Sequence, residues 1–388
     1  MAKRRYLVEQ FHRQRDTGEV QSEIVLQPQG RACASQAGDV ELPLTARIVR
    51  DGEDAFINQL DDTLAVTGLT SNPTIFDEAI GGTAAYDTAI AAMTRAGLSG
   101  EALFVELALE DLRRAADIFK PIHRATGGVD GWVSMEVSPL LADDTAGTVA
   151  AARAIYSQAG RDNLYVKIPG TVAGIAAIEE AIFLGIPINV TLLFSRDHYL
   201  AAATAYLKGI ERRLAAGLDP RVSSVASLFI SRWDRAVADK VPANLRNRLG
   251  IAVGQQTYMA YRELLATGRW QELAAAGARP QRLLWASTGM KDPAASPSAY
   301  VEALAAPATI NTMPEKTLLA FAATGKLSGT LAPDGGDSAQ VLEQFKAAGV
   351  DVGALAARLQ QDGALSFVKS WNELLSRIAS KSAALKSA

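Results

Sequence analysis

From about residue 64 onward, the hydrophobic positions of the chain follow two alternating patterns. Short runs rich in valine, isoleucine and leucine end in small or polar residues, and alanine-rich segments with apolar residues at i, i+3 and i+4 follow them. The apolar runs predict strands buried on both faces, and the alanine-rich segments predict amphipathic helices. The strand-like runs are 65–73, 131–139, 163–171, 186–194, 221–229, 282–290 and 307–314.

The number of alternations predicts the fold class, because seven exceed what a doubly wound half-domain normally holds. They fit an α/β fold, a (β/α)8 TIM barrel, provided that one further strand lies upstream. Two segments are candidates for that strand, "SEIVLQP" (22–28) and "TARIVRD" (45–51). We therefore expect a single barrel domain with a C-terminal helical tail over residues 41–388, preceded by an irregular or helical N-terminal extension over residues 1–40.

Composition and charge restrict the class of protein, its partners and its cellular compartment. Of 388 residues, 48% are hydrophobic and 21% charged, which is typical of a soluble globular protein. The net charge of -3 gives no reason to expect nucleic acid or an anionic membrane as a partner. No apolar run approaches the ~20 residues of a membrane span, and the N-terminus has no secretory signal pattern. The single cysteine, Cys33, fits a reducing compartment, so we predict a cytoplasmic protein.

The histidines give no indication of a metal site. His12, His123 and His198 are far apart and lack the spacing of metal ligands. We therefore expect neither a metal nor a cofactor.

Polar residues mark the ends of the predicted strands, which is where the active site of a barrel of this type lies. Any one of them is equally well explained as a cap of the turn that follows its strand. Their occurrence on six strands favours a functional site. These residues are Asn72, Glu136, Lys167, Asn189 with Thr191, Ser227 and Ser287.

Lys167 is the unusual member, because it ends the apolar run of "NLYVKIPGT" (163–171). Burial disfavours a charged amine and lowers its pKa from ~10.4, a value at which only about one amine in a few thousand is neutral at pH 7. A pKa of ~7–8 would make the neutral amine abundant enough to attack a carbonyl carbon. Glu136 could transfer the protons, directly or through a water that Thr191 holds. Alternatively, Lys167 extends to the surface without a catalytic role.

Several longer motifs carry a resemblance to a known family. In order along the chain they are "TGLTSNPTIF", "VSMEVSP", "NLYVKIPGT", "IPINVTLLFS", "SLFISRWD", "LLWASTGMKDP" and "TINTMP". Together they resemble the transaldolase family, in its longer bacterial type, over about residues 64–330. The resemblance implies metal-independent aldol transfer through a lysine Schiff base. Lys167 matches the family's Schiff-base lysine, Glu136 its acid/base glutamate, and Thr191 the residue that helps to hold the water between them.

The resemblance also implies a set of substrate contacts. Two asparagines match those that bind hydroxyl groups of a dihydroxyacetone unit, and the serine and arginine of "SLFISR" match residues near the substrate phosphate. A serine and a lysine in the strand-seven motif add a further binding residue and a second phosphate cation. In the same order, these residues are Asn72, Asn189, Ser227, Arg232, Ser287 and Lys291.

The first strand departs from the family pattern. The family has a catalytic aspartate there in a Leu-Asp context, and "ELPLTARIV" (41–49) contains none. Asp51 could serve if the register is shifted, and Asp39 and Glu41 fit less well. Asp51 is equally well explained as a turn residue beside Gly52, and strand one could also lack its acid.

The resemblance implies a transferase of the pentose phosphate pathway that acts on small sugar phosphates. We expect it to move a dihydroxyacetone unit from sedoheptulose 7-phosphate to glyceraldehyde 3-phosphate, which gives erythrose 4-phosphate and fructose 6-phosphate. Two alternatives stay open: a Schiff-base aldolase that cleaves fructose 6-phosphate, and a catalytically impaired barrel with a binding role.

Overall fold

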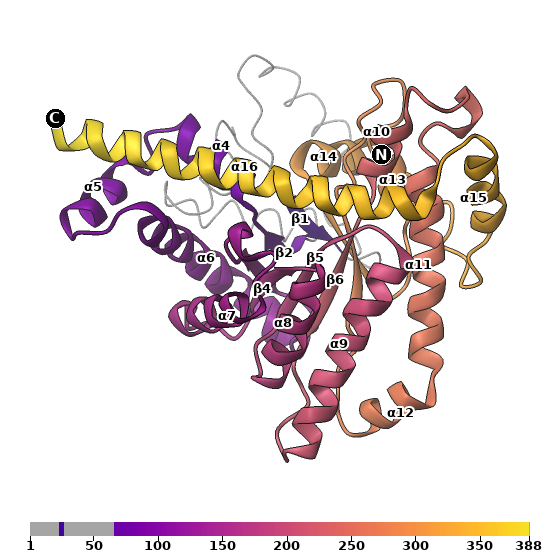
Figure 1. Ribbon diagram of the computed structural model, residues 1–388, viewed down its shortest axis with the longest axis horizontal. Coiled ribbons are helices and arrows are strands. Elements are labelled where there is room, and N and C mark those ends of the chain that lie inside the picture. Colours follow the sequence, from indigo (N-terminus) through magenta and orange to yellow (C-terminus); the bar gives the residue numbers. More distant parts are fainter. Residues whose placement is uncertain (1–22, 27–65, 388) are drawn as a thin grey trace, which may run out of the picture.

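The computed structural model describes residues 23–26 and 66–387. Figure 1 shows strands surrounded by helices, with one long helix lying across the molecule. The strands are β1 (Glu23–Leu26), β2 (Val66–Thr70), β3 (Trp132–Glu136), β4 (Leu164–Pro169), β5 (Ile188–Leu193), β6 (Ser224–Phe229), β7 (Arg282–Ala286) and β8 (Thr309–Pro314). They form a closed barrel in sequence order. The predicted barrel is confirmed, and each of the seven apolar runs contains one of the strands β2 to β8.

The closing strand differs from a regular (β/α)8 barrel. Each neighbouring pair from β2 to β8 is parallel, whereas β1 pairs antiparallel with both β2 and β8. β1 lies within the candidate segment 22–28, and the other candidate, 45–51, lies outside the described residues. Four residues of the segment 1–40 therefore take part in the barrel, and the proposed domain limits stay a prediction.

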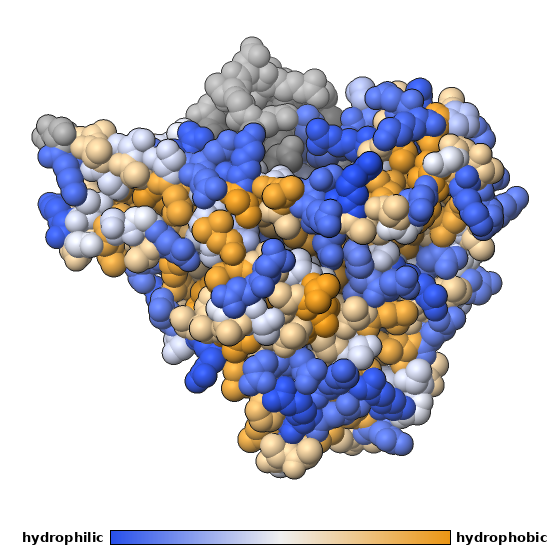
Figure 2. Space-filling view, viewed as in Figure 1, coloured by the Kyte–Doolittle hydropathy of each residue, from blue (hydrophilic) through white to orange (hydrophobic). Residues whose placement is uncertain are grey.

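Helices alternate with the strands and surround them. They are α4 (Pro73–Gly82), α5 (Asp87–Arg95), α6 (Gly100–Ala125), α7 (Thr145–Ala159), α8 (Val172–Phe183), α9 (Arg196–Ala215), α10 (Ser231–Val237), α11 (Leu249–Ala266), α12 (Gly268–Ala275), α13 (Ala299–Ala303), α14 (Glu315–Thr324), α15 (Ser338–Ala347) and α16 (Val352–Ser387), with short 3-10 turns η1 (Pro139–Leu141) and η2 (Ala243–Leu245). No helix among them is both long enough and apolar enough to cross a membrane. Figure 2 shows that hydrophilic residues cover much of the face in view.

Side chains cap the helices that directly follow three of the strands. Asn72, Thr171 and Ser195 begin α4, α8 and α9, and each accepts a hydrogen bond from a backbone N–H in the first turn of its helix. Such caps satisfy backbone groups that the helix itself leaves unpaired. They hold the carboxyl ends of β2, β4 and β5 close to the helices that follow.

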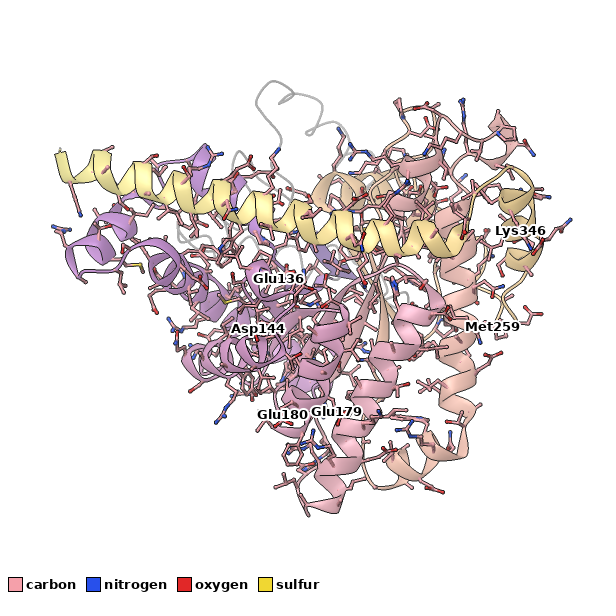
Figure 3. The ribbon with its side chains drawn as sticks, in the orientation of Figure 1. Glu136, Asp144, Glu179, Glu180, Met259 and Lys346 are labelled. Atoms are coloured by element: carbon pink, nitrogen blue, oxygen red, sulfur yellow. The ribbon has the colours of Figure 1, made fainter. Side chains whose placement is uncertain are left out.

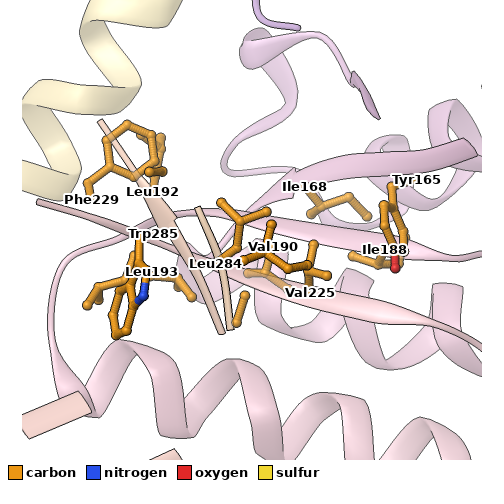
Figure 4. Packing of buried hydrophobic residues seen from close by; sticks show 14 of the residues in the cluster. Tyr165, Ile168, Ile188, Val190, Leu192, Leu193, Val225, Phe229, Leu284 and Trp285 are labelled. Atoms are coloured by element: carbon orange, nitrogen blue, oxygen red, sulfur yellow. The ribbon is translucent and has the colours of Figure 1, made fainter. Parts of the chain in front are cut away.

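Large apolar side chains of the barrel strands are buried on both faces of the sheet. Val190, Val225 and Leu284 pack together in the buried cluster shown in Figure 4, which Trp285 and Leu193 extend. Every residue of β4 to β7 is buried. The strands are therefore buried on both faces, as the unbroken apolar runs predict, and the core includes the helices that pack against them.

The amino-terminal end of the barrel is closed by polar and aromatic groups. Arg282 on β7 forms an ion pair with Asp130 at 3.1 Å, and both side chains are nearly buried. Trp132 on β3 stacks on Tyr165 of β4, with ring centroids 4.1 Å apart, and burial raises the pKa of the Tyr165 hydroxyl. These contacts leave the opposite, carboxyl end of the strands as the place for a site.

Helix α16 lies along that opposite end. Its buried side chains Phe367, Trp371, Leu374 and Ile378 form one stripe of the helix. The ring of Trp371 meets Phe104 of α6 edge-on at 5.1 Å between centroids. In Figure 1 the helix crosses above the ends of the barrel strands.

Candidate active site

Lys167 lies inside the barrel and does not extend to the surface. It is 4% exposed on β4, in register with Glu136 of β3 and Asn189 of β5. Its Nζ is 3.6 Å from Oε2 of Glu136 and donates a hydrogen bond to the backbone carbonyl of Ser71 at 3.1 Å. The structure therefore brings the candidate nucleophile and the candidate acid/base group together.

Glu136 is the last residue of β3, and Figure 3 shows it on the α16 side of the barrel. The backbone N–H of Val137 donates to the carbonyl of Lys167 at 3.1 Å, so β3 and β4 stay paired up to the site. Two residues after Asn189 on β5, Thr191 is fully buried. Its hydroxyl oxygen has no hydrogen-bond partner among the described residues.

Asn189 is held by hydroxyl groups on both sides. Its amide nitrogen donates to Oγ of Ser134 on β3 at 3.1 Å, and its amide oxygen accepts from Oγ of Ser227 on β6 at 2.7 Å. These two bonds fix the orientation of the amide, since one partner accepts and the other donates. The network joins three strands directly beside Lys167.

Arg232 is half-buried in the first turn of α10, just after β6. Its guanidinium carbon is 5.3 Å from the ring centroid of Phe229, the last residue of β6, and 5.9 Å from that of Phe367 on α16. A guanidinium at these distances is attracted to the electron-rich ring faces. The arginine of "SLFISR" is therefore positioned from two separate parts of the chain.

The remaining predicted residues lie around this cluster or away from it. Ser287 adopts a left-handed conformation, with φ of 56°, and its Oγ is 2.9 Å from that of Ser231. The side chain of Asn72 caps α4, as the structural explanation of this residue also predicts. Lys291 is exposed in the loop after β7. Asp51, and the weaker candidates at 39 and 41, lie outside the described residues.

Some residues beside the site were not predicted. The contact of Lys167 with the carbonyl of Ser71 involves the backbone, which carries no sequence signal. Ser134 could have been found, because it lies two residues before Glu136 and so faces the same side of the strand. Phe367 is separated from Arg232 by more than 100 residues, and no local pattern links them.

Metal-binding side chains do not gather in the part of the chain that the structure describes: no group of three or more His, Cys, Asp or Glu is placed to hold an ion. Lys167, Glu136, Thr191 and the amide of Asn189 instead supply an amine, a carboxyl group, a hydroxyl and an amide. A buried amine next to an acid/base group is the arrangement of enzymes that form Schiff bases with carbonyl substrates.

Sequence comparisons define the family. The model of the Transaldolase/Fructose-6-phosphate aldolase family matches residues 51–378. The chain is 44% identical to the transaldolase of Parafrankia sp. (strain EAN1pec) over 330 residues, which cover 82% of this chain and 89% of the relative. It is 44% identical to the transaldolase of Thermobifida fusca (strain YX), with the same coverage. It is 37% identical to transaldolase 2 of Nostoc punctiforme (strain ATCC 29133 / PCC 73102), over 87% of this chain and 93% of the relative. The chain belongs to the transaldolase/fructose-6-phosphate aldolase family of enzymes.

Proposed function

We propose that this enzyme is a transaldolase of the pentose phosphate pathway that acts in the cytoplasm. It transfers a dihydroxyacetone unit from sedoheptulose 7-phosphate to glyceraldehyde 3-phosphate and so forms erythrose 4-phosphate and fructose 6-phosphate. The observation that carries the proposal is the buried amine of Lys167, 3.6 Å from Glu136, in a barrel whose relatives are transaldolases.

The reaction begins when Lys167 Nζ attacks the C2 carbonyl of the ketose. Glu136 transfers protons through a water molecule, and loss of water from the carbinolamine leaves an iminium ion. Thr191 offers a buried hydroxyl with unused hydrogen-bonding capacity on the next strand, which supports its role in holding that water. The iminium then accepts the electron pair of the C3–C4 bond when the C4 hydroxyl loses its proton.

Cleavage releases the aldose and leaves a three-carbon enamine on Lys167. The enamine attacks the carbonyl carbon of the acceptor aldehyde, and hydrolysis of the new iminium frees the product ketose and the lysine. We propose Asp51 as the group that takes the proton from the C4 hydroxyl.

Substrate binding falls to side chains around the lysine. Asn72 and Asn189 bind hydroxyl groups of the sugar, Ser227 lies near the phosphate, and Ser287 adds a further binding residue at the end of β7. Arg232 binds the phosphate, because its planar guanidinium can donate two parallel hydrogen bonds to phosphate oxygens. Lys291 is proposed as the second phosphate cation.

Borohydride trapping tests the proposal. Reduction of the iminium converts it to a secondary amine, so the enzyme incubated with donor ketose and borohydride should gain the mass of the reduced sugar fragment at Lys167. Lys167→Met has a side chain of similar length to the aliphatic part of lysine, so it fills this buried position while removing the amine. The variant should form no adduct and show no turnover, while its circular dichroism and melting curve match the wild type. An adduct on another residue, or turnover by Lys167→Met, would refute the proposed nucleophile.

The family model also covers fructose-6-phosphate aldolases, so simple cleavage is the second candidate activity. Free dihydroxyacetone measured with and without an acceptor aldehyde separates the two. A transaldolase should release little dihydroxyacetone when no acceptor is present. Rapid, acceptor-independent release would show that the enzyme is an aldolase.

A further inference from the structure

Three residues of α16 lie against the carboxyl end of the barrel, next to the candidate active site. Gln360, Gly363 and Phe367 are spaced at i, i+3 and i+7 and therefore share one face of the helix. This face continues the buried stripe of Phe367, Trp371, Leu374 and Ile378 toward the start of the helix, and there it contacts the carboxyl ends of the barrel strands. We call it the α16 site face.

Gln360 ties together the ends of two catalytic strands. Its amide nitrogen donates one hydrogen bond to the carbonyl of Gly170, directly after β4, and one to the carbonyl of Leu192 on β5, each at 3.0 Å. Both N–H groups of the amide are thus used. Leu192 has a left-handed φ of 57°, a conformation that a leucine keeps only where its surroundings hold it.

Gly363 lets the helix approach Arg232 closely. A methyl group at this position would lie 3.1 Å from Nη1 of Arg232 and 2.9 Å from Cδ2 of Leu192. Glycine is among the least favourable residues inside a helix, and α16 extends well beyond this position on both sides. The close approach accounts for a glycine here.

Phe367 completes the contact with the arginine. Its ring centroid is 5.9 Å from the guanidinium carbon of Arg232, while that of Phe229 lies at 5.3 Å. One ring comes from the barrel and the other from α16, so the position of the guanidinium depends on where the helix lies.

We propose that the α16 site face is a positioning and specificity element of the enzyme: Gly363 and Phe367 place the guanidinium of Arg232 for a sugar phosphate, and Gln360 holds the strand ends that carry Lys167 and Thr191. The part that concerns phosphate rests on the proposed function of Arg232. The face acts through other residues and does not itself touch the reacting atoms.

Two glycines on the same helix provide a matched test. Gly363→Ala should raise the KM for glyceraldehyde 3-phosphate about tenfold, the effect of one charge-assisted hydrogen bond put out of line. It should leave kcat, and the KM for unphosphorylated glyceraldehyde, within about twofold of the wild type, since the other close contact is with Cδ2 of Leu192, the end of a side chain that can shift. Gly353→Ala is the control, because a methyl group there meets only the side chain of Asp351, at 3.5 Å. It should behave as the wild type. Equal loss with both acceptors, or no loss, would overturn the proposal.

Two neighbouring glutamines test the second part. Gln360→Ala should lower kcat about tenfold for phosphorylated and unphosphorylated acceptors alike, because it loosens the strand ends that position the reacting groups. Gln361→Ala, at an exposed position of the same helix, should not. Matching rates for the two variants would overturn this role of Gln360.

Phosphate binding without turnover separates this proposal from the proposed function. Titration calorimetry with inorganic phosphate should give a Kd about tenfold weaker for Gly363→Ala than for Gly353→Ala, even if the wild type forms no borohydride adduct and the transaldolase assignment fails. If Gly363→Ala does not fold, Phe367→Leu takes its place and should weaken phosphate binding about threefold through the lost ring contact. Unchanged phosphate binding in the folded variant would refute the positioning of Arg232.

Discussion

Replacing Glu136 by glutamine tests the acid/base group with little change in shape. The substitution keeps the length of a side chain that is only 5% exposed, and it removes the ability to carry a proton or a negative charge. A positioned acid/base group contributes about 10²–10⁴ to the rate, which corresponds to about 2.7–5.4 kcal/mol of activation free energy. We therefore expect Glu136→Gln to lower kcat by about 10²–10⁴.

The distance to Lys167 provides a second magnitude. Opposite charges 3.6 Å apart attract each other by about 4.6 kcal/mol at an effective dielectric constant of about 20, although the cost of burying both groups offsets much of this. Glu136→Asp keeps the charge and withdraws it by one methylene group, to about 5 Å, where the attraction is about 3.3 kcal/mol. The weaker attraction favours the neutral amine and so does not itself slow the reaction. The aspartate variant should instead lose roughly tenfold in rate because its carboxyl group is withdrawn from the proton that it transfers. The expected order of rates is therefore glutamate, then aspartate, then glutamine.

A coupled assay of transfer measures the kcat of the glutamine and aspartate variants, and borohydride trapping run beside it measures how much Schiff base each variant forms. Asp144→Asn is the matched control, because it also changes a carboxylate to an amide, and asparagine caps a helix as well as aspartate; Asp144 caps α7. Its rate should equal that of the wild type. If Glu136→Gln keeps more than about a tenth of the wild-type kcat while remaining folded, Glu136 is not the acid/base group.

Two further predictions concern stability. Burial lowers the pKa of His198, whose neutral Nδ1 accepts from the backbone N–H of Phe194 at 3.2 Å. The unfolded chain therefore takes up the proton first, so this stability is complete above about pH 6.5 and is lost as the pH falls through the lower pKa of the folded state. His198→Asn, which keeps an acceptor that does not titrate, should lose less melting temperature than the wild type between about pH 7 and pH 5; parallel curves would contradict this. Asp234→Ala removes the acceptor of the Tyr300 hydroxyl and of two backbone N–H groups at the start of α11. It should reduce the free energy of unfolding by about 3 kcal/mol or more, measured by urea denaturation, and a loss below about 1 kcal/mol would show that the buried network relaxes.

The barrel and the centre of the site could be predicted because both depend on local sequence signals. Unbroken apolar runs mark strands buried on both faces, and a polar residue that ends such a run must lie at the carboxyl end of the barrel. Lys167 and Glu136 follow from this rule, and their separation of 3.6 Å agrees with it. The contacts that depend on distant segments could not be predicted. The antiparallel β1 depends on pairing with two strands far along the chain, and the approach of Gly363 to Arg232 depends on how a terminal helix lies across the barrel.

Shelter from water connects the fold to the choice between transfer and cleavage. An enamine that waits for an acceptor must be kept from protonation and hydrolysis, and a closed site provides this. At the amino-terminal end, the barrel is sealed by the Arg282–Asp130 ion pair and by the stacked rings of Trp132 and Tyr165. At the carboxyl end, Gln360 draws α16 onto the ends of β4 and β5. In the proposed mechanism, the contacts that hold α16 on the ends of β4 and β5 therefore contribute to the shelter of the enamine, so loosening the helix should increase the release of dihydroxyacetone when no acceptor is present.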